Sequence, residues 1–165
     1  MRLRVSPPKP DAGQLPRSKA AKIRLAIIRA EYNSEITKSL EKKCVESLLA
    51  AGIAAKNLSV FAVPGCFEIP IMAQRLAAQK RYDAMIALGA VIRGDTYHFE
   101  LVVNGCAEGI MEVSLRHNVP IIFEVLATYN RRDALRRAGN NQLNKGLEAA
   151  RSALSLLAAL GKIKN

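Results

Sequence analysis

The feature that most constrains this chain is a regular alternation of short apolar runs with longer segments of helical periodicity. Apolar runs at 23–28, 58–63, 83–92 and 120–125 predict strands, and the segments at 35–51, 67–79, 99–117, 131–138 and 142–160 predict helices. Ser34 is the expected cap of the first helix. Strands that alternate with helices form a parallel sheet, and near-continuous apolar strands indicate that helices cover both of its faces. The predicted fold class is therefore α/β with a four-stranded parallel sheet.

The positive charge of the chain is concentrated near its amino-terminal end. The formal net charge is +11, but residues 1–24 hold seven basic residues and one acidic residue, which accounts for six of these charges. The same segment contains four prolines, so residues 1–21 are expected to form a flexible basic arm. Residues 22–165 are then a single domain. Residues 25–165 carry 18 basic and 13 acidic residues and are only mildly basic, which argues against a nucleic-acid-binding protein.

The cysteines and the hydropathy limit which classes of protein this chain can belong to. Cys44, Cys66 and Cys106 lie far apart in the sequence, and no C-x-x-C motif occurs. With only two histidines the sequence offers no spacing typical of a metal site, so no metal is expected. Free thiols are typical of a reducing compartment, and no apolar run reaches the length of about 18 residues that spans a bilayer. A cytoplasmic protein that does not bind a membrane is the expected class.

Polar and aromatic side chains follow the predicted strands where the strands end. Tyr32 and Asn33 follow the first strand, residues 65–68 follow the second, and residues 93–98 follow the third. Because the carboxyl ends of parallel strands meet at one edge of a sheet, these segments are expected to form one site. Residues 93–98 combine glycine, carboxylate, hydroxyl and histidine ahead of a helix, where amides favour an anion and a histidine can transfer protons. A phosphorylated substrate with a flat polar ring fits this mixture, although 94–96 could equally form a turn and helix cap.

Two longer motifs give these segments a family resemblance. V-P-G-C-F-E-I-P at 63–70 and G-A-V-I-R-G-D-T-Y-H at 89–98, together with the segments at 32–33, 120–125, 137–139 and 144–146, resemble the lumazine synthases of riboflavin biosynthesis. The resemblance runs from about residue 24 to residue 160. It implies a three-layer flavodoxin-like sandwich and a transferase that uses no metal or organic cofactor. The implied reaction condenses 5-amino-6-(D-ribitylamino)uracil with 3,4-dihydroxy-2-butanone 4-phosphate to 6,7-dimethyl-8-ribityllumazine, with loss of phosphate and water.

The resemblance also assigns roles to individual residues. His98 is the implied catalytic acid and base. The pyrimidine ring and the ribityl chain are assigned to Tyr32, Asn33, Cys66, Phe67, Glu68, Ala90, Val91, Ile92, Phe123 and Lys145. The phosphate of the second substrate is assigned to Gly94, Asp95, Thr96 and Arg137, with the Asp95 carboxylate turned away from it.

The implied assembly is a homo-oligomer built on pentamers, with active sites between adjacent subunits and Phe123 reaching the site of a neighbour. A pentamer, a decamer and an icosahedral shell stay open, and a riboflavin synthase is a candidate partner. Glu124 stands where the family commonly has glycine, and residues 127–129 also depart from the family pattern. These departures favour one alternative, a relative that binds flavin or lumazine without turnover. A basic nucleic-acid-binding protein and an archaeal-type riboflavin synthase are further alternatives.

Overall fold

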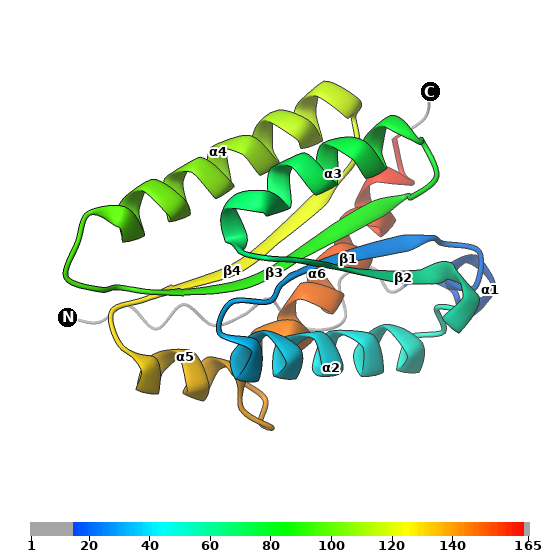
Figure 1. Cartoon of the computed structure of the whole chain (residues 1–165). Coiled ribbons are helices and arrows are strands. Elements are labelled where there is room, and N and C mark those ends of the chain that lie inside the picture. Colours follow the sequence, from blue (N-terminus) through cyan, green and yellow to red (C-terminus); the bar gives the residue numbers. More distant parts are fainter. Residues whose placement is uncertain (1–14, 164–165) are drawn as a thin grey trace.

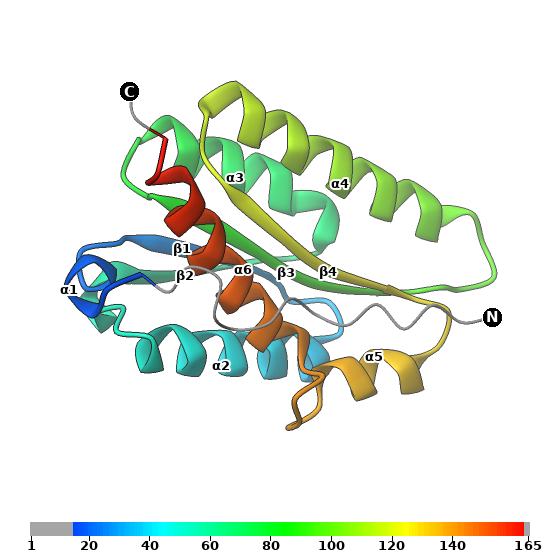
Figure 2. The same cartoon turned by 180° about the vertical axis from the view of Figure 1, so that it is seen from behind.

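The computed structural model describes residues 15–163 and has three layers, a sheet with helices on both faces (Figure 1 and Figure 2). The strands are β1 (Leu25–Ala30), β2 (Leu58–Val63), β3 (Ala84–Ile92) and β4 (Ile121–Thr128). The α-helices are α1 (Arg17–Ala20), α2 (Ser34–Ala50), α3 (Ile69–Ala78), α4 (His98–His117), α5 (Arg131–Ala138) and α6 (Lys145–Leu160). Two 3-10 turns, η1 (Ala55–Asn57) and η2 (Cys66–Glu68), flank β2. Over the described residues, no helix has the length and apolar character needed to cross a membrane.

The sheet has the strand order β2-β1-β3-β4, and every neighbouring pair is parallel. The prediction of an α/β fold with a four-stranded parallel sheet in a flavodoxin-like sandwich is confirmed. The chain leaves β1 for β2 on one side and later returns to β3 on the other, so the strand order reverses between β1 and β3. In such sheets, ligands bind beyond the carboxyl ends of the strands at this reversal.

The sheet separates two hydrophobic cores, and β1 contributes to both. Leu25 and Ile27 pack with Leu40 of α2 on the face that α2, α5 and α6 cover. Ala26 and Ile28 pack with residues of α3 and α4 on the opposite face. All six residues of β1 are buried and five of them are apolar, as expected for a strand covered on both faces. The sixth, Arg29, is paired with Glu41 of α2.

Several local expectations differ from the structure. The strand predicted at 23–28 is β1 at Leu25–Ala30, and the helix predicted from residue 142 begins at Lys145. Ser34 does not cap α2, because Asn33 occupies the cap position in a left-handed conformation with φ of 57° and makes no side-chain cap bond. Asparagine tolerates this conformation better than most residues. The strand predicted at 120–125 continues to Thr128, because β3 is long enough to extend the ladder to the pair Ile92–Thr128.

The end of the expected arm packs against the domain. Residues 17–20 form the short helix α1, and Ala20 is buried in the core with Leu25 and Ile27. Asn57 Nδ2 donates a hydrogen bond to the Ala21 carbonyl at 2.8 Å. Residues 17–20 of the expected arm are therefore helical and packed, and residues 1–14 of the arm lie outside the described residues.

Candidate functional site

Backbone and side-chain hydrogen bonds tie together the carboxyl ends of three strands. The Glu31 amide donates to the Val63 carbonyl at 2.8 Å, and the Tyr32 amide donates to the Pro64 carbonyl at 3.0 Å. Asn33 Nδ2 donates to the Ala90 carbonyl at 2.9 Å. The turn after β1 is thereby held between the ends of β2 and β3, at the edge where the sequence places the site.

The last residues of β3 offer an unpaired backbone edge. Pairing between β1 and β3 ends at Arg29–Leu88, whereas pairing between β3 and β4 continues to Ile92. Backbone groups of 90–92 that face β1 therefore have no strand partner, and Asn33 reaches one of them. Ala90 as a whole is 1% exposed and its carbonyl is taken by Asn33, whereas Val91 and Ile92 are partly exposed. An exposed row of amides and carbonyls can read the edge of a planar polar ring.

Two aromatic rings lie exposed at this edge. Tyr32 is 73% exposed and Phe67 is 60% exposed. Phe67 rests on Gly105 of α4, where an added Cβ would lie 2.7 Å from the ring. Exposed, held aromatic rings of this kind are suited to stacking against a planar ligand.

The two other residues of the η2 turn differ in their exposure. Glu68 is partly buried, and its Oε2 curls back to lie 3.0 Å from where a Cβ on Gly65 would stand. Cys66 is only 4% exposed, and its Sγ packs against Gly89. Burial raises the pKa of the Cys66 thiol to about 11. The Cys66 side chain therefore belongs to the core beside Gly89.

The loop between β3 and α4 is exposed throughout residues 93–98. The helix begins at His98, and Tyr97 at its cap position makes no side-chain cap bond. Gly94, Asp95 and Thr96 thus do not serve as the helix cap, and an added Cβ on Gly94 would meet nothing within 4 Å. The loop leaves its amides and the Thr96 hydroxyl open to solvent at the start of a long helix, where an anion is favoured.

Four residues that were not predicted as site residues secure the base of this loop. The Arg93 amide donates to the Thr128 carbonyl at 2.9 Å. The Arg93 guanidinium lies 5.6 Å from the centre of the Tyr129 ring and 3.7 Å from a Glu100 oxygen. The arginine directly after a strand was visible in the sequence, but its partners come from β4 and α4 and could not be read from local spacing.

A second group of charged residues gathers around Glu124 on the face that α5 and α6 cover. The carboxyl group is partly buried, and loss of hydration raises its pKa to about 7. Lys145 and Arg137 lower this pKa, while Glu148 raises it. Lys145 Nζ also donates to Glu148 Oε2 at 2.5 Å. The residues predicted at 137 and 145 therefore share one electrostatic environment with Glu124.

The start of α6 is fixed by a residue that the sequence did not single out. Asn144 is 1% exposed, and its Oδ1 accepts from the Gly146 amide at 2.8 Å. Its Nδ2 donates to the carbonyls of Ala138 and Gly139 at 2.8 and 2.9 Å. Asn144 thereby joins the end of α5 to the start of α6, and it positions Arg137 relative to Lys145. In the sequence, Asn144 appears as the first residue of the N-K-G segment at 144–146.

The two groups of predicted residues are not joined within one chain. Tyr32, Asn33, Phe67, Glu68 and the 90–98 segment surround the edge between β1 and β3. Among residues 15–163, no hydrogen bond or ion pair connects this first group with Arg137 or Lys145. Phe123 is 39% exposed on β4 and belongs to neither network.

Groups able to hold a metal ion were also considered. Within the described residues, His, Cys, Asp and Glu side chains form no group of three that could hold one. Cys44, Cys66 and Cys106 are buried and free. Burial raises the pKa of the Cys44 and Cys106 thiols to about 12, so they are poor nucleophiles in the folded chain.

Comparisons with known proteins agree on one family. A family model described as 6,7-dimethyl-8-ribityllumazine synthase matches residues 22–160. The chain is 43% identical over 142 residues to the 6,7-dimethyl-8-ribityllumazine synthase of Leuconostoc mesenteroides subsp. mesenteroides. That alignment covers 86% of this chain and 91% of the relative.

Proposed function

Because the chain belongs to the 6,7-dimethyl-8-ribityllumazine synthase family, we propose that the carboxyl edge of its sheet is the catalytic site. The chain is a transferase of riboflavin biosynthesis. It condenses 5-amino-6-(D-ribitylamino)uracil with 3,4-dihydroxy-2-butanone 4-phosphate and releases phosphate and water. The observation that carries the site assignment is the Asn33–Ala90 hydrogen bond, which brings the exposed Tyr32 beside the open backbone of β3.

The pyrimidine substrate is proposed to bind between Tyr32 and the 90–92 backbone. The Tyr32 ring stacks on the pyrimidine, and backbone groups of Val91 and Ile92 hydrogen-bond to its edge. Glu68 accepts hydrogen bonds from hydroxyls of the ribityl chain. The exposure of Tyr32 and the unpaired backbone beyond Leu88 support this placement.

The phosphorylated substrate is proposed to bind at the 94–96 loop, with Arg137 pairing to its phosphate. Amides at the start of α4 and the Thr96 hydroxyl donate to the phosphate oxygens. His98 then moves protons as the amine attacks the ketone, water leaves to give the imine, and phosphate is eliminated. Positioning of the two reactants supplies the rest of the acceleration.

The assembly is proposed to be a homopentamer whose sites lie between adjacent subunits. Two observations support this arrangement. Arg137 and Lys145 are not connected to the His98 loop within the described chain, so a neighbouring copy can supply them. Leu101, Met111 and Leu115 are 56%, 60% and 74% exposed along one face of α4, and Ile71 of α3 is 57% exposed. An apolar stripe of this kind is typical of an interface.

The compartment is proposed to be the cytoplasm, with a riboflavin synthase as the consumer of the lumazine product. The three free cysteines support a reducing compartment. The lumazine product must be taken up by a further enzyme before a flavin results.

The test is turnover of the purified protein with both substrates, followed by lumazine absorbance against the uncatalysed reaction. Arg137→Ala is expected to raise the KM for the butanone phosphate, and His98→Ala to slow condensation by roughly ten- to a thousandfold. Arg132→Ala, which removes a neighbouring exposed arginine of α5, is the matched control and keeps the wild-type KM.

Three results would contradict the proposal. An unchanged KM in Arg137→Ala removes that residue from the phosphate site, and an unchanged rate in His98→Ala removes the histidine from proton transfer. Bound pyrimidine or flavin without product would instead identify a ligand-binding relative.

A further inference from the structure

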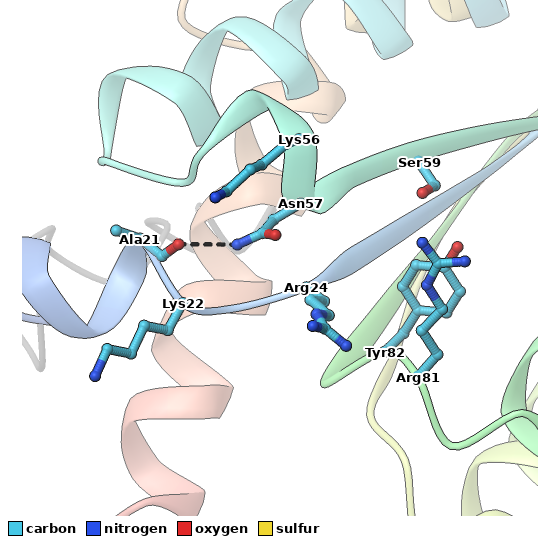
Figure 3. Close-up of a pocket in the computed structure, with 8 residues that line it drawn as sticks. All are labelled: Ala21, Lys22, Arg24, Lys56, Asn57, Ser59, Arg81 and Tyr82. Atoms are coloured by element: carbon cyan, nitrogen blue, oxygen red, sulfur yellow. Dashed lines mark hydrogen bonds between the residues drawn. The ribbon is translucent and has the colours of Figure 1, made fainter.

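A basic pocket lies at the amino-terminal edge of the sheet, opposite the proposed catalytic edge. It has a volume of about 500 Å³ and opens beside the starts of β1 and β2 and the loop before β3 (Figure 3). The residues that give it its chemistry are Lys22, Arg24, Lys56, Ser59, Arg81 and Tyr82. This volume is within the range of pockets that bind small molecules.

The four cationic side chains of this pocket form no ion pairs within the described chain. Asp83 is the neighbouring acid in the sequence, and its Oδ2 is engaged by the Arg24 amide at 2.7 Å. Four cations around one concavity create a positive potential that favours a multivalent anion.

The walls of the pocket are held in place by local contacts. The Arg81 guanidinium lies 5.8 Å from the centre of the Tyr82 ring, and Figure 3 shows it lying against that ring. Tyr82 is itself 9% exposed and makes an edge contact with Phe61, with ring centres 6.3 Å apart. The Asn57–Ala21 hydrogen bond joins the η1 turn to the segment before β1. An arginine held in this way, as Arg81 is, loses less conformational freedom when it binds an anion.

The donors of the pocket match phosphate oxygens. Arginine offers a planar fork that binds phosphate with two parallel hydrogen bonds, and the two lysines add mobile point charges. Ser59 Oγ and the Tyr82 hydroxyl face the same concavity and have no hydrogen-bond partner among residues 15–163. We propose that this pocket binds the oligophosphate group of a small molecule, with two or more linked phosphates per site.

The pocket is separate from the proposed catalytic machinery. Arg24 precedes β1 and Arg81 precedes β3, whereas Tyr32 and His98 follow the same two strands. A ligand at the amino edge therefore leaves the condensation residues free. The two sites can be tested independently for this reason.

The experiment is calorimetric titration of the purified protein with pyrophosphate at fixed ionic strength, with sulfate as the comparison anion. Saturable binding of one pyrophosphate per chain is expected, with weaker binding of sulfate. Arg24→Gln and Arg81→Gln should each weaken it about tenfold. Arg81→Lys keeps the charge but loses the planar fork, so an intermediate loss is expected. Arg75→Gln removes an exposed arginine of α3 and is the matched control, with unchanged affinity.

Arg137→Ala and the amino-edge variants distinguish this pocket from the proposed substrate-phosphate site. Pyrophosphate binding is expected to persist in Arg137→Ala, and Arg24→Gln with Arg81→Gln is expected to keep wild-type lumazine formation. Thermal melts of all variants check that the fold is intact.

Three results would overturn the proposal. The first is loss of pyrophosphate binding in Arg137→Ala with retention in the amino-edge variants. The second is equal binding of sulfate and pyrophosphate in every variant. The third is an unchanged pyrophosphate affinity with an altered assembly mass in Arg24→Gln or Arg81→Gln, which would make the pocket a contact between copies.

Discussion

Glu124 loses hydration in the folded protein, and the cations around it only partly offset this loss. The carboxyl group sits on β4 opposite Leu88 and is partly buried against the face that α6 covers. Two cations and one carboxylate share its surroundings, and loss of hydration is the largest influence on its pKa. Because burial removes water from the carboxylate, it raises the free energy of the charged form relative to the protonated form.

The stability of the protein is expected to depend on the ionisation of Glu124. Its pKa rises from an ordinary 4.5 to about 7 on folding, so the folded protein retains a proton that the unfolded chain has lost. The free energy of unfolding therefore falls as the pH rises from about 4.5 through about 7. Glu124→Gln should raise the free energy of unfolding at pH 8 by about 1–3 kcal/mol, with a smaller gain at pH 5.

Denaturant unfolding at both pH values measures this effect. Glu108→Gln removes an exposed carboxylate of α4 and serves as the control for the change in net charge. An equal gain at pH 5 and pH 8, or the same gain in the control, would refute the role given to Glu124.

At this scale, the sequence predicted which side chains follow the strands but not which of them face a ligand. Tyr32 and Phe67 are exposed at the carboxyl edge, where the site is proposed. Cys66 has the same local sequence context but turns into the core beside Gly89. Whether a residue of a 3-10 turn faces the core depends on packing against β3, and no local pattern encodes that contact.

At the scale of elements, the tightest glycine position among the described residues lies between α2 and α6. An added Cβ on Gly146 would lie 2.0 Å from the Leu40 carbonyl oxygen, so only glycine fits where α6 begins. Ala149, Ala150 and Ala153 continue the same buried face of α6. Small residues therefore let these two helices cover one face of the sheet side by side.

Substitution of this glycine is expected to separate the two helices. Gly146→Ala should lower the free energy of unfolding by about 3 kcal/mol, because backbone atoms rather than a flexible side chain must move. Gly94→Ala is the matched control: its Cβ would meet nothing within 4 Å, so a change within about 0.5 kcal/mol is expected. Thermal or denaturant unfolding measures both, and equal losses would contradict this account of the contact.

Most of the elements were predictable because apolar periodicity survives in every buried strand and helix. The predicted β2 and α5 agree with the observed bounds Leu58–Val63 and Arg131–Ala138. The end of β4 and the start of α6 were not predictable, since β4 continues only because β3 extends beside it. The start of α6 depends on buried Asn144, whose partners lie at the end of α5.

For the whole molecule, the exposed apolar face of α4 is the feature that a single chain leaves unexplained. Wild-type protein is expected to sediment at about five times the mass of one chain. Leu115→Glu places a charge at a side chain that is 74% exposed and should shift the protein to smaller species. Leu49→Glu on α2, 41% exposed, is the control and should leave the mass unchanged. A wild-type monomer, or an unchanged mass in Leu115→Glu, would exclude α4 as the interface.

The core beneath α6 has a consequence for how the protein is made. Leu25 and Ile27 of the first strand share that core with Ala149, Ala150 and Ala153 of the last described helix. A ribosome must therefore synthesise almost the entire chain before this face of the sheet can close. Until α6 emerges, the nascent chain presents an apolar surface that holdase chaperones can bind, and a chain truncated before α6 should be removed by proteolysis.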